Sequence, residues 1–240
     1  MNKKCIPNLS IIVPFYNEEK SIEILYASLK NTMERLDQSY EIIFVNDGSS
    51  DMTLNALNNL VLKTKDLIVC TLPQHMGKSI ALQKGFDIAK GELIITLDGD
   101  LQDVPEEIPK LLHEMQKGYD MVCGWRHKRK DSFMKIFVSG IANALRRVIS
   151  GENIHDVGCS LRVFKRGILK DIHLSGGMHR LFTLIVKRAG YKIGEVKINH
   201  CHRKFGRSKY NFTGRLFEGI IDFAYIYFSG AERRRQSKRL

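Results

Sequence analysis

The sequence has few cysteines and no C-x-x-C pair. Its five cysteines lie far apart along the 240 residues, and their odd number does not suit a disulfide framework. This pattern is typical of reduced thiols in a cytosolic compartment. The first residues also lead directly into a predicted strand at Leu9, which leaves no room for the apolar core of a signal peptide. We therefore expect a protein that stays in the cytoplasm.

A long uninterrupted apolar run is also missing near the end of the chain. The aromatic stretch at residues 212–228 contains Glu218 and Asp222 and is shorter than the roughly 20 apolar residues that a spanning helix needs. It predicts instead an amphipathic helix in the plane of a membrane interface; the alternative is a helix packed on its own domain. A basic tail that begins at Arg233 would add a weak, salt-sensitive attraction to an anionic membrane surface.

Two familiar nucleotide-binding motifs are missing. The turn after the first predicted strand reads Pro14-Phe15-Tyr16-Asn17-Glu18, without the G-x-G-x-x-G pattern of dinucleotide-binding folds. The sequence Gly77-Lys78-Ser79 is similar to the end of a phosphate-binding P-loop, but Leu72 stands where that motif begins with glycine. The sequence therefore excludes a P-loop ATPase.

Basic residues outnumber acidic ones. The chain has 38 lysines and arginines against 26 aspartates and glutamates, which gives a net charge of +12 and a pI near 9.5. Such an excess indicates a polyanionic partner, either membrane lipid, nucleic acid or a phosphorylated substrate. No recognised nucleic-acid motif accompanies the charge, so we expect no nucleic-acid partner.

Short apolar runs alternate with helical stretches through the first half of the chain. The predicted strands are residues 9–13, 42–45, 67–72, 93–97 and 119–123. The predicted helices are residues 18–36, 52–62, 78–90 and 105–117. This alternation predicts an α/β fold with a mostly parallel sheet and helices on both faces.

The second half is less regular. A basic connector at residues 126–135 precedes a predicted helix at 137–149, and strand-like segments follow at 161–164 and 191–198. No change in composition marks a linker between these parts. We therefore expect one domain over residues 1–210, followed by an amphipathic helix and basic tail over residues 211–240.

Acidic turns follow two of the predicted strands. Asp98 and Asp100 come directly after the fourth strand, and Asp47 follows the second. Ligands of open parallel sheets bind at the carboxyl ends of the strands, so both turns are expected at one edge. Carboxylates there suit Mg²⁺ or Mn²⁺ holding a diphosphate. The alternative is an ordinary solvated turn, in which Ser50 or Asp51 caps the next helix.

Six sequence blocks together resemble a known family. They are VPFYNE at residues 13–18, VNDGSSD at 45–51, GK at 77–78, DGDLQDVPE at 98–106, DVGCSLRVF at 156–164 and HRKFGRSKY at 202–210. The chain is similar over about residues 10–210 to the family-two glycosyltransferases of GT-A fold. Within these it resembles the polyprenyl-phosphate (dolichyl-phosphate) mannose and glucose synthases. One departure is Asn46, where many relatives have aspartate, so the contact to the nucleotide base is less certain.

The resemblance implies roles for several groups of residues. The nucleotide pocket would contain Pro14, Tyr16, Glu18 and Asp47, with Gly77 and Lys78 as further substrate-binding residues. Metal and diphosphate ligands would be Asp98, Asp100 and Gln102. The acceptor phosphate would bind Arg126, Arg129, Lys135 and Ser139. A late loop that closes over the donor diphosphate would supply Arg203, Ser208 and Lys209.

The resemblance also implies a reaction. It is the inverting transfer of a hexose, with mannose or glucose favoured, from a GDP- or UDP-sugar to a polyprenyl or dolichyl phosphate at the cytoplasmic face of a membrane. Asp100, Asp156 and Arg126 would be the catalytic residues, although Asp156 could equally be a turn former before Gly158. A phosphate acceptor is already anionic and needs no strong general base.

Two other functions stay open. Transfer to a saccharide or other hydroxyl acceptor would need a general base, for which Asp103 and Asp156 are candidates. An idle subunit that only binds nucleotide sugar or membrane is the third possibility. The intact Asp98, Asp100 and Gln102 argue against it.

Overall fold

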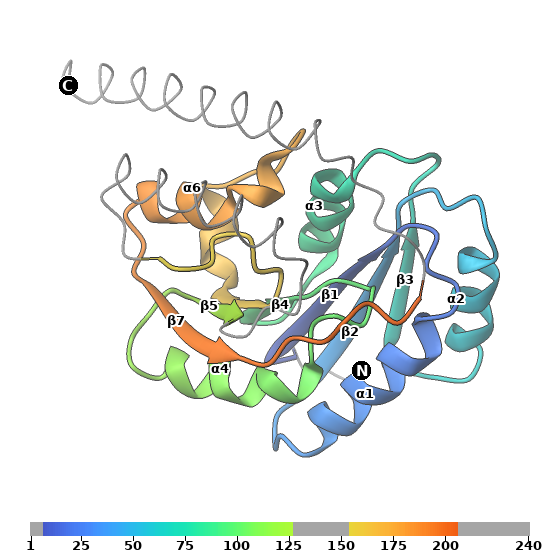
Figure 1. The fold of residues 1–240 in the computed structure, drawn as a ribbon, viewed down its shortest axis with the longest axis horizontal. Helices are drawn as coiled ribbons and strands as arrows, with labels where there is room; N and C mark the ends of the chain where they lie inside the picture. The colour runs from blue at the N-terminus through green and yellow to red at the C-terminus, as the bar shows by residue number, and fades with distance from the viewer. Residues whose placement is uncertain (1–6, 127–153, 206–240) are drawn as a thin grey trace, which may run out of the picture.

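The computed structural model describes residues 7–126 and 154–205, and it places seven strands in one sheet (Figure 1). The strand order is β3-β2-β1-β4-β6-β5-β7. The strands are β1 (Leu9–Phe15), β2 (Tyr40–Asn46), β3 (Leu67–Thr71), β4 (Leu93–Thr96), β5 (Met121–Arg126), β6 (Arg162–Lys165) and β7 (Ile193–Ile198).

Helices connect most of these strands. The α-helices are α1 (Ile22–Glu34), α2 (Thr53–Val61), α3 (Lys78–Ile88), α4 (Ile108–Met115) and α6 (Phe182–Arg188). Short 3-10 helices are η1 (Pro105–Glu107), η2 (Arg166–Lys170) and η3 (Met178–Arg180). The predicted helix at 105–117 is thus confirmed, with a 3-10 first turn at Pro105.

The sheet has a hydrophobic core on each face. Along β1, Ile11, Val13 and Phe15 pack on the side of α1, α2 and α4, whereas Ile12 packs on the side of α3 and α6. This alternation follows from the period of two in a strand. Figure 1 shows α3 and α6 above the sheet, and α1 and α4 below it. The predicted α/β architecture with helices on both faces is confirmed.

Strand β6 is the antiparallel strand of the mostly parallel sheet that the sequence predicts. It lies between β4 and β5 and runs antiparallel to both. The physical reason is where the chain re-enters the sheet: Asp156 lies at the same edge as Arg126, so β6 must run back from that edge. Helix α6, which the sequence patterns did not indicate, then returns the chain to β7 on the parallel course.

Pro14 corrects the predicted boundary of the first strand. The strand does not close at Pro14 but continues to Phe15, with Pro14 opposite Val45 of β2. On its other side β1 pairs with β4 only as far as Ile12. A proline beyond that point removes no hydrogen bond from that ladder, so the strand tolerates it.

Several predictions lie outside the described residues. These are the helices at 137–149 and 212–228, the domain boundary at 210, and the site residues Arg129, Lys135, Ser139, Ser208 and Lys209. Within residues 7–126 and 154–205, none of the helices combines the length and apolar character required to span a bilayer.

Candidate active site

The carboxyl ends of β1, β2, β4 and β5 carry the predicted site residues at one edge of the sheet. Glu18 follows β1, Asp47 follows β2, Asp98 follows β4 and Arg126 ends β5. The segment after β7, orange in Figure 1, crosses this edge toward α1. It brings Arg203 to the same place from the far end of the fold.

The turn after β4 has a conformation that its sequence explains. A side chain at Gly99 would place its Cβ 2.6 Å from the ring of Phe15, so only glycine fits between the two aspartates. Leu101 has a φ of 61°, a left-handed conformation that is unfavourable for leucine. The Oδ1 atom of Asp100 accepts a hydrogen bond from the Gln102 N–H at 3.1 Å. Such strain is common at functional sites.

Both aspartates of this turn are paired with basic side chains. Lys78, at the start of α3, forms an ion pair with Asp98. Arg203 donates to Glu18 Oε1 and to Asp100 Oδ2, both at 2.6 Å. Arg203 thus contacts residues that lie 185 and 103 positions before it in the sequence. Both cations are long side chains, so they can move without a change in the backbone.

The electrostatics of the two aspartates differ. Burial alone would raise the pKa of Asp98, but the charge of Lys78 and its hydrogen bond hold that pKa below its usual value. Burial and the negative charge of Asp98 raise the pKa of Asp100 to about 6, against the opposing effect of Arg203. The two carboxylates of this turn therefore have pKa values shifted in opposite directions.

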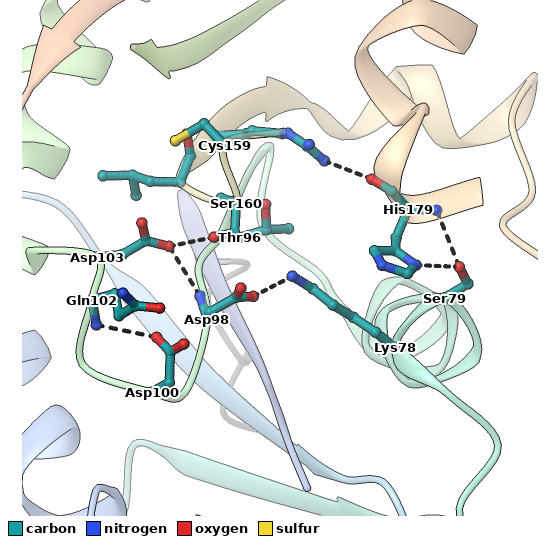
Figure 2. A network of polar contacts seen from close by, with 12 residues as sticks. Lys78, Ser79, Thr96, Asp98, Asp100, Gln102, Asp103, Cys159, Ser160 and His179 are labelled. Carbon is teal, nitrogen blue, oxygen red and sulfur yellow. Dashed lines mark hydrogen bonds and ion pairs between the residues drawn. The ribbon is translucent and has the colours of Figure 1, made fainter. Parts of the chain in front are cut away.

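Asp103 is a third carboxylate beside this turn. Its side chain is 3% exposed and accepts hydrogen bonds from Ser160 Oγ at 2.6 Å and from the Asp98 N–H at 3.2 Å. Burial and the charge of Asp98 raise its pKa. Figure 2 shows Asp103 facing Ser160 and the backbone of Asp98, which makes it a fixed support for the turn.

Asp47 is buried, with 2% of its surface exposed, and its carboxylate is held by the loop before α3. Its carboxylate accepts hydrogen bonds from the N–H groups of Met76 at 2.8 Å and Gly77 at 3.0 Å, and contacts His75 Nδ1 at 2.9 Å. The ring of His75 stacks on Tyr16, with the ring centroids 3.7 Å apart. Asp47 thereby fastens the segment that leads to Lys78.

Arg126 and Asp156 form a two-pronged ion pair. The Nε and Nη2 atoms of Arg126 lie 2.7 and 2.8 Å from the carboxylate of Asp156. Glu195 of β7 in turn accepts hydrogen bonds from the N–H groups of His155 and Asp156. Asp156 is therefore more than a turn former, because it orients the guanidinium at the end of β5.

His179 is a site residue that the sequence patterns did not indicate. Its Nδ1 atom lies 2.8 Å from Ser79 Oγ, and its N–H donates to the same oxygen at 3.0 Å. Figure 2 shows this pair beside Lys78, whose ammonium reaches Asp98. Only the neighbourhood of Gly77 and Lys78 singles out Ser79 in the sequence; no local signal singles out His179, His75 or Glu195.

The turn after β4 suits a divalent cation. Mg²⁺ and Mn²⁺ commonly take one or two carboxylates and complete their shell with water and substrate phosphate. A cation there would relieve the repulsion that raises the pKa of Asp100. Among the described residues no three histidine, cysteine or acidic side chains converge on one point. Asp98, Asp100 and Gln102 are the residues that could hold such a cation, together with ligands from substrate or water.

Comparison with known proteins identifies the family. The sequence model of the family described as Glycosyl transferase family 2 matches residues 10–173. The chain belongs to this family. The predicted membership is confirmed, and the match includes the turns that carry Glu18, Asp47, Asp98 and Asp100.

Curated relatives of this family-two chain act in lipid-linked sugar chemistry, as their names state. A dodecaprenyl-phosphate galacturonate synthase from Rhizobium johnstonii is 37% identical over 225 residues, which are 92% of this chain and 66% of the relative. An undecaprenyl-phosphate 4-deoxy-4-formamido-L-arabinose transferase from Photorhabdus laumondii is 35% identical over 213 residues, 88% of this chain and 66% of the relative. The chain thus spans slightly less than two thirds of these relatives.

Solved structures share the fold. Mannosyl-3-phosphoglycerate synthase from Rubrobacter xylanophilus aligns with a TM-score of 0.72 at 16% identity, over 98% of this chain and 76% of that protein. A mannosyltransferase from Pyrobaculum calidifontis in complex with GDP-Man and Mn²⁺ aligns with a TM-score of 0.67 at 19% identity, over 92% of this chain and 64% of that protein. The predicted GT-A fold is confirmed.

Proposed function

We propose that this family-two chain transfers a sugar from a nucleotide diphosphate sugar to a polyprenyl phosphate, with inversion at the anomeric carbon. The observation that carries the proposal is the row of charged groups along one sheet edge. Asp98 and Asp100 at β4 have displaceable cationic partners, and Arg126 at β5 presents an oriented guanidinium. The turn with Asp98 and Asp100 suits a donor diphosphate held through a cation. The guanidinium of Arg126 suits an acceptor phosphate.

The donor end uses residues around Asp98 and Asp100. These carboxylates, with Gln102, would hold Mg²⁺ or Mn²⁺, and the ion would neutralise the charge that develops on the leaving diphosphate. When the carboxylates have another cation, Lys78 and Arg203 are released to bind phosphate oxygens. Both already lie at the turn, so the release requires only side-chain rotation.

The acceptor end uses Arg126. Asp156 occupies Nε and Nη2 and fixes the plane of the guanidinium, so that, among the described residues, Nη1 is the atom that would bind the oxygens of a phosphate monoester. Such an acceptor is anionic at neutral pH and attacks without a strong general base. Arg129, Lys135 and Ser139 belong to this proposal as further phosphate ligands.

A hydroxyl acceptor has less support at this site. It would need a free general base within reach. The carboxylate of Asp103 is enclosed and already bonded to Ser160, while that of Asp156 is paired with Arg126. An anionic acceptor avoids this requirement.

The sugar itself is a matter for experiment. The sequence resemblance favours mannose or glucose from a GDP- or UDP-donor, and that preference stays a prediction. The names of the two curated relatives instead specify galacturonate and 4-deoxy-4-formamido-L-arabinose. A donor panel must therefore include both neutral and acidic sugars.

Association with the cytoplasmic face of a membrane is part of the proposal. The net charge of +12 favours an anionic surface, and a polyprenyl acceptor resides in a bilayer. The predicted amphipathic helix and basic tail over residues 211–240 would supply the contact.

The direct test is product formation. Purified protein with Mn²⁺ or Mg²⁺, a short polyprenyl phosphate and a panel of GDP- and UDP-sugars should give one glycosylated lipid by mass spectrometry. A chelator should abolish it and Asp100→Asn should lower it about 10²- to 10³-fold, whereas Asp66→Asn, away from the site edge, should leave it unchanged. Binding of donor without lipid product across the panel would overturn the proposed acceptor.

A further inference from the structure

His179 lies at a defined place in the charged row. It belongs to η3, which packs against α3, and its carbonyl oxygen accepts a hydrogen bond from Arg162 Nη1 of β6 at 3.3 Å. In the sheet, β6 lies between β4, which leads to Asp98, and β5, which ends at Arg126. His179 therefore stands over the interval between the donor end and the acceptor end.

Ser79 Oγ contacts both the backbone and the ring of His179. It accepts the backbone N–H of His179, and we assign its own O–H as the donor to Nδ1. The proton of the neutral ring then resides on Nε2. Within the described part of the chain, Nε2 has no hydrogen-bond partner of its own.

The ring is neutral under working conditions. Burial, followed by the positive charges of Lys78 and Arg180, lowers the pKa of His179 to about 2. A neutral imidazole is a hydrogen-bond donor without charge, and at this pKa it is a poor base. It is therefore less suited to a phosphate than Lys78, Arg203 or Arg126.

The turn that carries His179 is firmly held. Arg162 is 4% exposed, donates to the carbonyl oxygens of Val157 and His179, and lies over the ring of Phe182 at 5.7 Å. One buried guanidinium thus connects the loop of Asp156 to the turn of His179. Such support keeps the imidazole in place when the site is empty or filled.

We propose that His179 is a positioning residue that donates its Nε2–H to one oxygen substituent of the transferred sugar. This inference rests on the proposed function. In an in-line transfer the sugar lies between the leaving diphosphate and the attacking phosphate. His179 lies beside this interval. The charged side chains would bind the phosphates, and the neutral His179 ring would donate to a hydroxyl or carboxylate of the sugar.

The test compares ligands with and without the sugar. Isothermal titration with the nucleotide sugar that the wild type uses, and with the matching nucleoside diphosphate, separates the two contributions. His179→Ala should bind the nucleotide sugar about 5- to 30-fold more weakly and the nucleoside diphosphate unchanged. His179→Gln, which retains an N–H donor, should recover part of the affinity, and Ser79→Ala should lie between. His173→Ala, an exposed histidine before the same turn, is the matched control.

Deoxy donors identify the oxygen. A donor that lacks the contacted substituent should bind wild type and His179→Ala equally, whereas other deoxy donors should keep the difference. Equal weakening of the nucleoside diphosphate, or of every analogue, would assign His179 a purely structural role and overturn the inference. Sugar-dependent binding without lipid product would overturn only the proposed acceptor. A wild type that binds no nucleotide sugar would overturn both.

Discussion

The acidic turn after β2 and the acidic turn after β4 lie at the same edge of the sheet, yet their carboxylates have different partners. Asp47 is held by two backbone N–H groups and by His75. Asp98 and Asp100 are instead paired with Lys78 and Arg203, which are flexible cationic side chains.

The difference separates a carboxylate held mainly by backbone groups from carboxylates held by basic side chains. Backbone donors cannot leave Asp47 unless the loop before α3 moves, so this residue shapes the site by fixing that loop. Lysine and arginine side chains can rotate away from Asp98 and Asp100 without movement of the backbone. Carboxylates at equivalent positions after β2 and β4 thus differ in how firmly they are held. The groups that they pair with make this difference.

The largest expected effect is on turnover. Asp100→Asn should lower kcat about 10²- to 10³-fold, because it removes charge where the leaving diphosphate must be neutralised. Lipid product formed per minute at saturating donor measures the loss, with the melting temperature as the check on folding. Near wild-type turnover in this variant would contradict a catalytic role for the turn after β4, and would leave it no different in function from the turn after β2.

Stability should respond to the other turn. Asp47→Ala should lower the free energy of unfolding by about 1–3 kcal/mol, because it leaves the N–H groups of Met76 and Gly77 without their acceptor. Asp98→Ala should cost less, since it also removes repulsion from Asp100. Urea denaturation of the two variants compares them directly, and a greater loss in Asp98→Ala would contradict this assignment.

The affinity for Mn²⁺ should depend on the lysine that pairs with Asp98. Lys78→Met removes the cation that competes for Asp98, so Mn²⁺ should bind about two- to fivefold more tightly in the absence of nucleotide. Titration of the free Mn²⁺ signal by electron paramagnetic resonance measures this affinity. Lys110→Met, which alters an ion pair on α4, is the control and should leave Mn²⁺ binding unchanged. Weaker binding in Lys78→Met would show that the lysine supports the cation site.

The last prediction concerns Asp66, a carboxylate away from the site edge. Burial would raise its pKa, but hydrogen bonds from Tyr26 and Tyr40 lower it below the usual value. A lowered folded-state pKa stabilises the protein above the unfolded value near 4, and this stabilisation is lost as the pH falls through the folded value.

Asp66→Asn should therefore cost about 1 kcal/mol at pH 7 and less at pH 3. Urea denaturation of wild type and variant across that pH range measures the difference. If the difference in free energy of unfolding between wild type and variant stayed constant with pH, the charge of the Asp66 carboxylate would not contribute to stability.

Much of the fold follows from local sequence patterns. Strands and helices of the first half lie within a few residues of their predicted positions, because periods of two and 3.6 are properties of neighbouring residues. The position of Asp47, Asp98 and Asp100 at strand ends follows from the same patterns. Helix α6 was missed because its seven residues carry too short an apolar pattern to stand out.

The partners of the site residues could not be derived in the same way. His179 meets Ser79 across 100 positions and Arg203 meets Glu18 across 185, and no local pattern encodes either contact. Both depend on the strand order and on β6 running backward between β4 and β5. The sequence by itself determined the family, the α/β alternation and which carboxylates reach the sheet edge. Only the tertiary structure decided their partners, because ion pairs and hydrogen bonds form between groups that distant segments bring within 3 Å or so of each other.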